Sequence, residues 1–192
     1  MEVSFLIEQE LHAALNEACT EITPPLLKEA MFDAMFPGGA RVRPRLLLAV
    51  ARACGDTSMH VAMTAAAAIE MLHCASVVHD DMPCFDDADL RRGKPSVHAK
   101  YGEAMALLVG DGLIIQAFDH LARRLALMPE RLVALLPVVT QGVGTVRGIV
   151  AGQAWECESA RDLALYQQAK TGSLFAACTM AGAAAAGRDA AP

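Results

Sequence analysis

Five carboxylates lie within ten residues, from Asp80 to Asp89, and three cationic side chains follow them directly. The segment reads HDDMPCFDDADLRRGKP over residues 79–95. Acidic clusters are usually solvated helix ends, but this one follows the nearly uncharged run 69–78, so Asp80 and Asp81 should emerge from the end of a buried helix. Carboxylates there are costly unless they are paired. Mg2+ is the natural partner, because it takes oxygen ligands from one or two carboxylates and substrate phosphates. The segment therefore predicts a metal and phosphate site.

The elements around this segment decide whether its carboxylates meet. On a straight helix Asp80 and Asp86 would lie about 120° apart and could not share ions. Pro83 lacks an N–H and clashes with the carbonyl of His79, so it is expected to kink or bulge the helix between them. The distortion would bring Asp80 and Asp86 together.

The helix predicted over residues 58–78 positions the motif. Looking back from Asp80, the side chains of Ser76, His73 and Ile69 lie within about 40° of the same face. We therefore expect them to line the wall of a cavity below the metal. Taken alone, a histidine on an apolar helix is more often a buried core side chain. His73 is a candidate only because it shares a helix face with Ser76 and Asp80.

Two groups of cations stand beside glycine or proline. In GGARVRPRL, residues 38–46, a glycine turn leads into a helix that extends to Cys54. Backbone N–H groups at such a helix start, with arginines beside them, form an anion site; solvated arginines at an ordinary helix start are the alternative. RRGKP at residues 91–95 cannot be helix interior, and its adjacent arginines point in different directions, so each can bind a different diphosphate.

Composition sets the class of protein. The chain has 192 residues, is 54% apolar and only 5% aromatic, and is rich in alanine and leucine, which favours packed helices. We predict an all-α, single-domain protein over residues 1–192. Further helices are expected at 5–20, 26–35, 96–126 and 129–156, with a last one that contains Lys170.

Charge and cysteine usage narrow the partners. A net charge of −6 argues against nucleic acid. The six cysteines form no CxxC pair and are expected to be reduced thiols of a cytoplasmic protein. No signal peptide is evident, and the longest charge-free run, residues 171–187, is too short and too weakly apolar to predict a membrane span.

The motifs together resemble those of the trans-isoprenyl diphosphate synthases, or polyprenyl synthetases, and most closely the bacterial geranylgeranyl diphosphate synthases of carotenoid pathways. The resemblance rests on the aspartate motif in its DDxxxxD form at 80–86, on RRGKP at 91–95, on GGARVRP at 38–44 and on KTG at 170–172. It implies an antiparallel helix bundle around a central cavity. It also implies head-to-tail transfer, in which Mg2+ assists ionisation of an allylic diphosphate and isopentenyl diphosphate attacks the resulting cation.

The resemblance also implies a role for each site residue. Asp80 and Asp86 would hold Mg2+, with Asp81 as a supporting ligand. The allylic diphosphate would be bound by Arg91, Lys170 and Thr171. The isopentenyl diphosphate would be bound by Arg41, Arg43, His73 and Arg92. The family closes its cavity with a bulky aromatic four or five residues before the motif, where this chain has Ser76 and Ala75. We therefore predict a geranylgeranyl (C20) rather than a farnesyl (C15) product, and this prediction requires Ser76 to face the cavity.

The chain departs from the family pattern in three places. Ala40 replaces the usual lysine, which leaves the phosphate to Arg41 and Arg43. The segment GIVAGQAWE, residues 148–156, ends in Glu156 where the family has aspartate, and we interpret its glycines as helix-packing positions. No second aspartate-rich motif follows, so the bundle is expected to lack its C-terminal helices.

Three functions remain open at this point. The first is an active prenyltransferase, expected as a homodimer because of its apolar content. The second is a non-catalytic subunit or inactive fragment, which the missing second motif favours. The third is a class I terpene cyclase, which needs no second anion site and is therefore disfavoured by the two groups of arginines.

Overall fold

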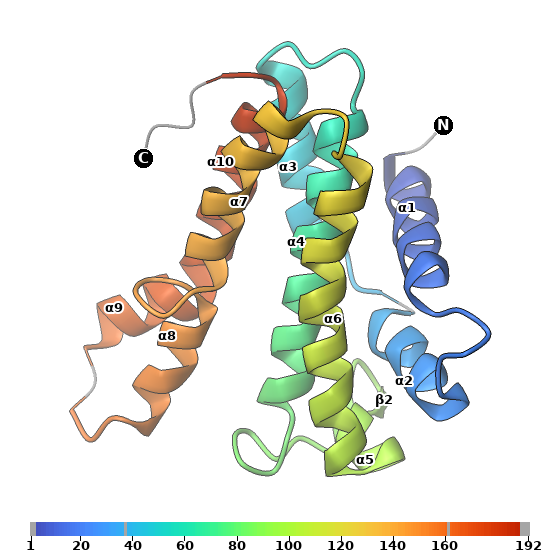
Figure 1. Ribbon diagram of the computed structural model, residues 1–192. Coiled ribbons are helices and arrows are strands. Elements are labelled where there is room, and N and C mark those ends of the chain that lie inside the picture. Colours follow the sequence, from blue (N-terminus) through green and yellow to red (C-terminus); the bar gives the residue numbers. More distant parts are fainter. Residues whose placement is uncertain (1–2, 37, 161, 189–192) are drawn as a thin grey trace.

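The computed structural model describes residues 3–36, 38–160 and 162–188 and is almost wholly helical (Figure 1). Its α-helices are α1 (Val3–Ala18), α2 (Pro25–Met35), α3 (Val42–Ala53), α4 (His60–Asp80), α5 (Val97–Tyr101), α6 (Glu103–Arg124), α7 (Pro129–Val143), α8 (Ile149–Ala154), α9 (Leu163–Gln167) and α10 (Ser173–Ala185). A 3-10 turn (Trp155–Cys157) follows α8, and a π-helical turn (Gln168–Gly172) joins α9 to α10. The two-residue strands β1 (Leu90–Arg91) and β2 (Lys94–Pro95) pair antiparallel. The predicted all-α fold is confirmed.

Helix α4 is the centre of the core and packs against α6, α3, α10 and α1. Figure 1 shows α1 and α2 on one side of it and the arm of α7 to α10 on the other. Its sequence explains this position, because the alanine-rich stretch 61–68 has high helix propensity and small side chains that let neighbouring helices approach closely. A helix that is apolar on nearly every face must be buried.

Two helices, α4 and α6, are long and apolar enough to cross a membrane by length and composition. The apolar window of α4 is 78% buried inside the fold and that of α6 44% buried. Core helices of globular proteins pass the same test, so this is weak evidence for a membrane span.

Two helices expected as continuous are broken by glycine. The helix predicted over 96–126 divides into α5 and α6 at Gly102, whose φ of 87° interrupts the helical backbone. The helix predicted over 129–156 divides into α7 and α8 between Gly144 and Gly148. A Cβ on Gly148 would lie 2.2 Å from the backbone nitrogen of Gly144, so the chain turns here at a spacing that only glycine permits.

Pro83 does not kink α4, which corrects the expectation for that residue. The helix ends at Asp80, and Pro83 lies in the turn that follows. The Asp86 N–H donates to the carbonyl oxygen of Asp80 at 2.9 Å, so the turn folds back on the helix end. Asp86 reaches Asp80 because the helix stops before the proline.

Candidate functional site

An acidic cluster lies at the C-terminal end of α4. Oxygen atoms of Asp80, Asp86 and Glu156 all lie within 4.8 Å of one another. The predicted convergence of Asp80 and Asp86 is therefore confirmed. Partial burial and the negative charge of Asp80 raise the pKa of Asp86. Three carboxylates at this spacing repel one another unless positive charge lies among them.

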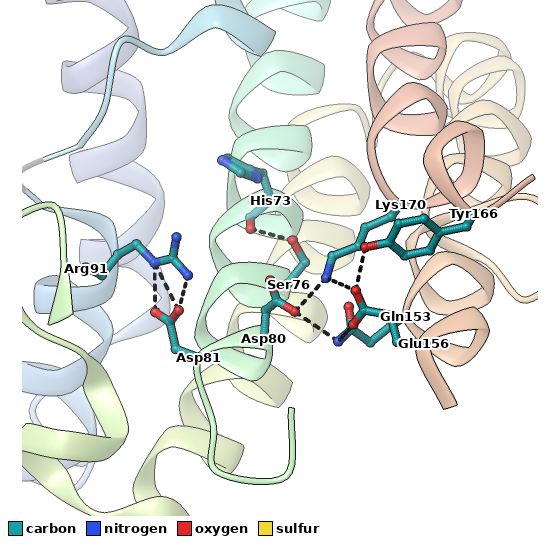
Figure 2. Close-up of polar contacts among 9 residues, drawn as sticks. All are labelled: His73, Ser76, Asp80, Asp81, Arg91, Gln153, Glu156, Tyr166 and Lys170. Carbon is teal, nitrogen blue, oxygen red and sulfur yellow. Dashed lines mark hydrogen bonds and ion pairs between the residues drawn. The ribbon is translucent and has the colours of Figure 1, made fainter. Parts of the chain in front are cut away.

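Lys170 supplies that charge (Figure 2). Its Nζ donates to Asp80 Oδ1 at 3.0 Å and to Glu156 Oε1 at 2.7 Å. Burial opposes the charge of Lys170, but the hydrogen bonds with Glu156 and Asp80 outweigh it and raise the pKa of the lysine. Gln153 Nε2 donates to the same two carboxylates at 2.9 Å each. The cluster therefore joins α4, α8 and the π-helical turn.

The backbone explains how Lys170 reaches α4. It lies in the π-helical turn Gln168–Gly172, and such turns often occur at functional sites. A Cβ on Gly152 would lie 2.3 Å from the Lys170 backbone nitrogen, so α8 packs directly on this turn. The packing interpretation of Gly152 is thus confirmed. Thr171 follows in the same turn and is exposed.

Sequence reasoning missed the polar residues that complete this cluster. Glu156 was interpreted only as a departure from the family motif, and Gln153 and Tyr166 were given no role. Tyr166 donates its hydroxyl proton to Glu156 Oε1 at 2.5 Å. The available signal was the spacing of Gln153 and Glu156, three residues apart in an otherwise apolar stretch.

An apolar cavity of about 440 Å³ lies beside the cluster. Its wall comes from α4, the 81–89 turn, α6, α7 and α8: Leu72, Ala75, Ser76, His79, Asp80, Phe85, Ile114, Val143, Ile149, Val150, Gln153, Ala154 and Cys157. Ser76 faces the cavity, as the product-length prediction requires, and donates its hydroxyl proton to the His73 carbonyl at 2.8 Å.

The face of α4 that lines the cavity differs from the predicted one. Leu72 and His79 line it in place of Ile69 and His73. Ile69 is fully buried in the core, and Figure 2 shows the imidazole of His73 pointing away from Lys170. The cavity-lining residues of α4 are those that face α6 and α8, because these two helices form other walls of the cavity. The spacing of residues along α4 does not by itself show where those helices lie.

A basic cluster lies on another face of α4. Burial, reinforced by the positive charges of Arg43 and Arg92, lowers the pKa of His73 to about 3, so its imidazole is neutral at pH 7. The Arg43 guanidinium stands 4.7 Å over the Phe175 ring, and its Nε is buried without a hydrogen-bond partner in the described part of the chain. Arg43, His73 and Arg92 thus lie within electrostatic range of one another, and all three belong to the set predicted from the sequence to bind the isopentenyl diphosphate.

The β1–β2 hairpin brings Arg92 to this site. Arg92 and Gly93 both have positive φ, of 53° and 77°, which is typical of a tight two-residue hairpin turn. A Cβ on Gly39 would lie 2.7 Å from the Arg92 guanidinium carbon. The glycine segment and the double arginine, far apart in sequence, are therefore in contact.

Asp81 does not join the acidic cluster, which corrects its expected role as a supporting metal ligand. Its side chain is buried, with 2% of the residue exposed, and accepts hydrogen bonds from Arg91 Nε at 3.0 Å. Figure 2 shows this pair on the opposite side of α4 from Asp80. Adjacent helical residues point about 100° apart, so Asp81 cannot share the face of Asp80. The hydrogen bond with Asp81 raises the pKa of Arg91.

Arg41, expected as a substrate ligand, is paired with protein groups in the structure. Only 4% of the residue is exposed, and its guanidinium donates to Glu8, Glu70 and the Met35 carbonyl. To bind a diphosphate, this buried side chain would first have to give up all three of these partners. Arg43, His73 and Arg92 therefore remain as the candidate anion-binding residues.

The helix bundle and its acidic and basic clusters define a class of protein: the chain belongs to the polyprenyl synthetase family, whose family model matches residues 24–192. It is 51% identical over 192 residues to a geranylgeranyl diphosphate synthase of Rhodobacter capsulatus, covering 100% of this chain and 66% of that protein. It is 50% identical over 186 residues to a geranylgeranyl diphosphate synthase of Cereibacter sphaeroides, covering 97% and 65%. The chain thus spans about two thirds of the length of these relatives.

Solved structures agree. A geranyltransferase from Legionella pneumophila superposes with a TM-score of 0.84 at 37% identity, covering 95% of this chain and 66% of that one. An FPP/GFPP synthase from Zymomonas mobilis gives a TM-score of 0.83 at 35% identity, covering 96% and 71%. The family resemblance read from the motifs is confirmed.

Proposed function

We propose that this chain carries out head-to-tail prenyl transfer, joining isopentenyl diphosphate to an allylic diphosphate to give geranylgeranyl diphosphate. One observation carries the proposal: α4 bears an acidic cluster at the edge of an apolar cavity and a basic cluster on a neighbouring face. A terpene cyclase needs no second anion site. The names of the relatives support the synthase over a non-catalytic subunit.

The acidic cluster fits Mg2+. Asp80, Asp86 and Glu156 offer only oxygen ligands at a spacing that one or two hard cations can bridge. Asp80 and Asp86 would hold the ion, as the motif indicates, and Glu156 would assist. When bound, Mg2+ supplies positive charge to the oxygens of the departing diphosphate.

The residues of the chain have separate tasks in this reaction. Lys170 and Arg91, with Thr171 beside the lysine, would bind the allylic diphosphate, while Arg43, His73 and Arg92 bind the isopentenyl one. The apolar cavity excludes water from the allylic cation after the C1–O bond breaks. The isopentenyl double bond then forms the new bond to C1, and the departing diphosphate accepts the proton, so no side chain need act as base.

Lys170 and Arg91 must exchange partners to do this. In the structure both are bound to carboxylates, Lys170 to Asp80 and Glu156 and Arg91 to Asp81. A diphosphate carries more negative charge than a single carboxylate and accepts shorter, stronger hydrogen bonds. Release of Lys170 to the substrate would therefore free oxygens of Asp80 and Glu156 for the metal.

The decisive assay incubates the chain with Mg2+, radiolabelled isopentenyl diphosphate and geranyl diphosphate, a C10 starter, and identifies the dephosphorylated product. A C20 product supports the proposal, and a C15 limit would refute the product length. Binding of isopentenyl diphosphate without any product would favour the non-catalytic alternative. Failure to bind isopentenyl diphosphate would favour the cyclase.

We further propose that the chain is a single domain, forms a homodimer, acts in the cytoplasm and does not bind nucleic acid. Exposed apolar side chains on α6, among them Leu107, Leu108 and Ile115, support self-association. All six cysteines are free thiols, which suits a reducing compartment. Sedimentation velocity measures the oligomeric state, and a monomer at micromolar concentration would refute the dimer.

A further inference from the structure

A buried ion-pair cluster lies behind the anion site and has no counterpart in the sequence-based assignment. Arg41 Nε donates to Glu8 Oε1 at 2.7 Å, its Nη2 to Glu8 Oε2 at 3.1 Å and to the Met35 carbonyl at 2.8 Å, and its Nη1 to Glu70 Oε1 at 2.8 Å. Burial opposes the charge of Arg41, but the hydrogen bonds with Glu8 and Glu70 outweigh it and raise the arginine pKa. One guanidinium thus connects α1, the end of α2, the start of α3 and α4.

The same guanidinium shapes the glycine segment. A Cβ on Gly38 would lie 2.0 Å from the Arg41 guanidinium carbon, and one on Gly39 would lie 2.7 Å from that of Arg92. The two glycines therefore leave room for two arginines, one facing the interior and one facing the anion site. Arg41 itself has φ 48° and ψ 43°, a left-handed conformation that L-residues other than glycine disfavour. Its hydrogen bonds hold the backbone there.

Glu70 links this cluster to the anion site. Only 2% of the residue is exposed. Burial lowers the pKa of Arg43, and the negative charge of Glu70 opposes that shift. Glu70 therefore hydrogen-bonds Arg41 and lies within electrostatic range of Arg43, which in turn lies within electrostatic range of His73.

We propose that Arg41 is a positioning residue: by binding Glu8, Glu70 and the Met35 carbonyl, it holds the glycine segment where Arg43, His73 and Arg92 converge, and it does not bind substrate. The proposal rests on the anion site of the proposed function. Through Glu8, helix α1 then helps to position the anion-binding residues. Helix α1 lies before the residues that the family model matches, 24–192.

The test removes Glu8, the most accessible member, whose side chain is 36% exposed. Calorimetry measures binding of inorganic pyrophosphate in EDTA, so that no metal occupies the acidic cluster. We expect Glu8→Ala to weaken binding at least fivefold. Glu17→Ala is the matched control, because Glu17 lies on the same helix and only approaches Arg124 at 3.8 Å; it should bind as the unmodified chain does. Arg43→Ala should abolish binding.

Two further readouts separate positioning from general loss of structure. The NMR-measured pKa of His73 should rise in Glu8→Ala, because Arg43 and Arg92 move away, and stay unchanged in Glu17→Ala. Mn2+ affinity at the acidic cluster should not change in either variant. Should Glu8→Ala fail to fold, Glu8→Gln retains a hydrogen-bond acceptor of the same size and should show the same direction of change.

The outcomes are distinct. Equal pyrophosphate affinity in Glu8→Ala and the unmodified chain would overturn the positioning role and leave the proposed function intact. A parallel loss of pyrophosphate and Mn2+ binding would also overturn it, because that result indicates general disruption. No pyrophosphate binding by the unmodified chain would overturn the anion site and, with it, both proposals.

Discussion

Replacing Ser76 by phenylalanine should shorten the product. Ser76 lies four residues before Asp80, and Leu72, also on the cavity wall, lies eight before it. At a rise of 1.5 Å per residue these positions stand about 6 and 12 Å from the metal end of α4. A phenyl ring at 76 therefore raises the floor by roughly 6 Å, close to the length of one isoprene unit.

The size of the effect follows from the carbon atoms that lose their burial. One isoprene unit has five carbons, and burial of each contributes about 0.8 kcal/mol, which gives about 4 kcal/mol as an upper limit. That corresponds to nearly a thousandfold change in the C15 to C20 ratio. We expect at least a hundredfold change, because side chains around the new ring will adjust.

The assay is thin-layer chromatography of dephosphorylated, radiolabelled products from the Ser76→Phe variant. Ser76→Ala is the matched control. It removes the hydrogen bond to the His73 carbonyl, which the helix already satisfies, and adds no bulk, so it should keep the C20 product. A Ser76→Phe enzyme that still makes C20 would refute the placement of the growing chain in this cavity.

Three other perturbations test the site. Lys170→Met removes the cation between Asp80 and Glu156. It should tighten Mn2+ binding, measured by electron paramagnetic resonance, and lower the rate of prenyl transfer at least a hundredfold. Weaker Mn2+ binding in the variant would contradict the geometry. The pKa of His73 is about 3 in the folded state, below its value in the unfolded chain. As the pH falls below about 6.5, the unfolded chain therefore binds a proton at His73 that the folded chain does not bind. The free energy of unfolding should decrease between pH 6.5 and 3. Urea titrations of the chain and of His73→Gln measure that slope, which should be shallower in the variant. Gly152→Ala places a Cβ against the Lys170 backbone and should cost about 1–3 kcal/mol of stability by thermal unfolding. Gly112→Ala meets only ordinary contact with Met31 and should be neutral or stabilising; equal effects at both glycines would refute the close packing of α8.

Composition was sufficient to predict the helical fold, and the aspartate motif with Pro83 inside it was sufficient to predict the meeting of Asp80 with Asp86. The route to that meeting was not predictable, because a proline after a long helix can either bend it or follow its end. Here the helix ends at Asp80 and the turn hydrogen bond from Asp86 completes the approach.

The roles of adjacent charged residues were harder to assign from sequence. Arg41 and Arg43 are two positions apart, and the left-handed backbone at Arg41 directs its side chain inward towards partners that are 33 and 29 residues distant along the chain. Asp81 depends in the same way on Arg91, which a hairpin carries to it. Glu156 joins the acidic cluster through tertiary packing, and its spacing from Gln153 was the only signal that its neighbours in the sequence offered.

Because Asp80 and His73 lie on one continuous helix, α4 would fix the separation and the relative angle of the two diphosphates in the proposed reaction. An insertion of a single residue between His73 and Asp80 would rotate one binding site relative to the other by about 100° around the helix axis and shift it by about 1.5 Å along that axis. The residue count of this stretch is therefore fixed by the geometry, in addition to the constraints that the cavity places on its side chains. Any length polymorphism has to fall in the loops beyond the ends of this helix.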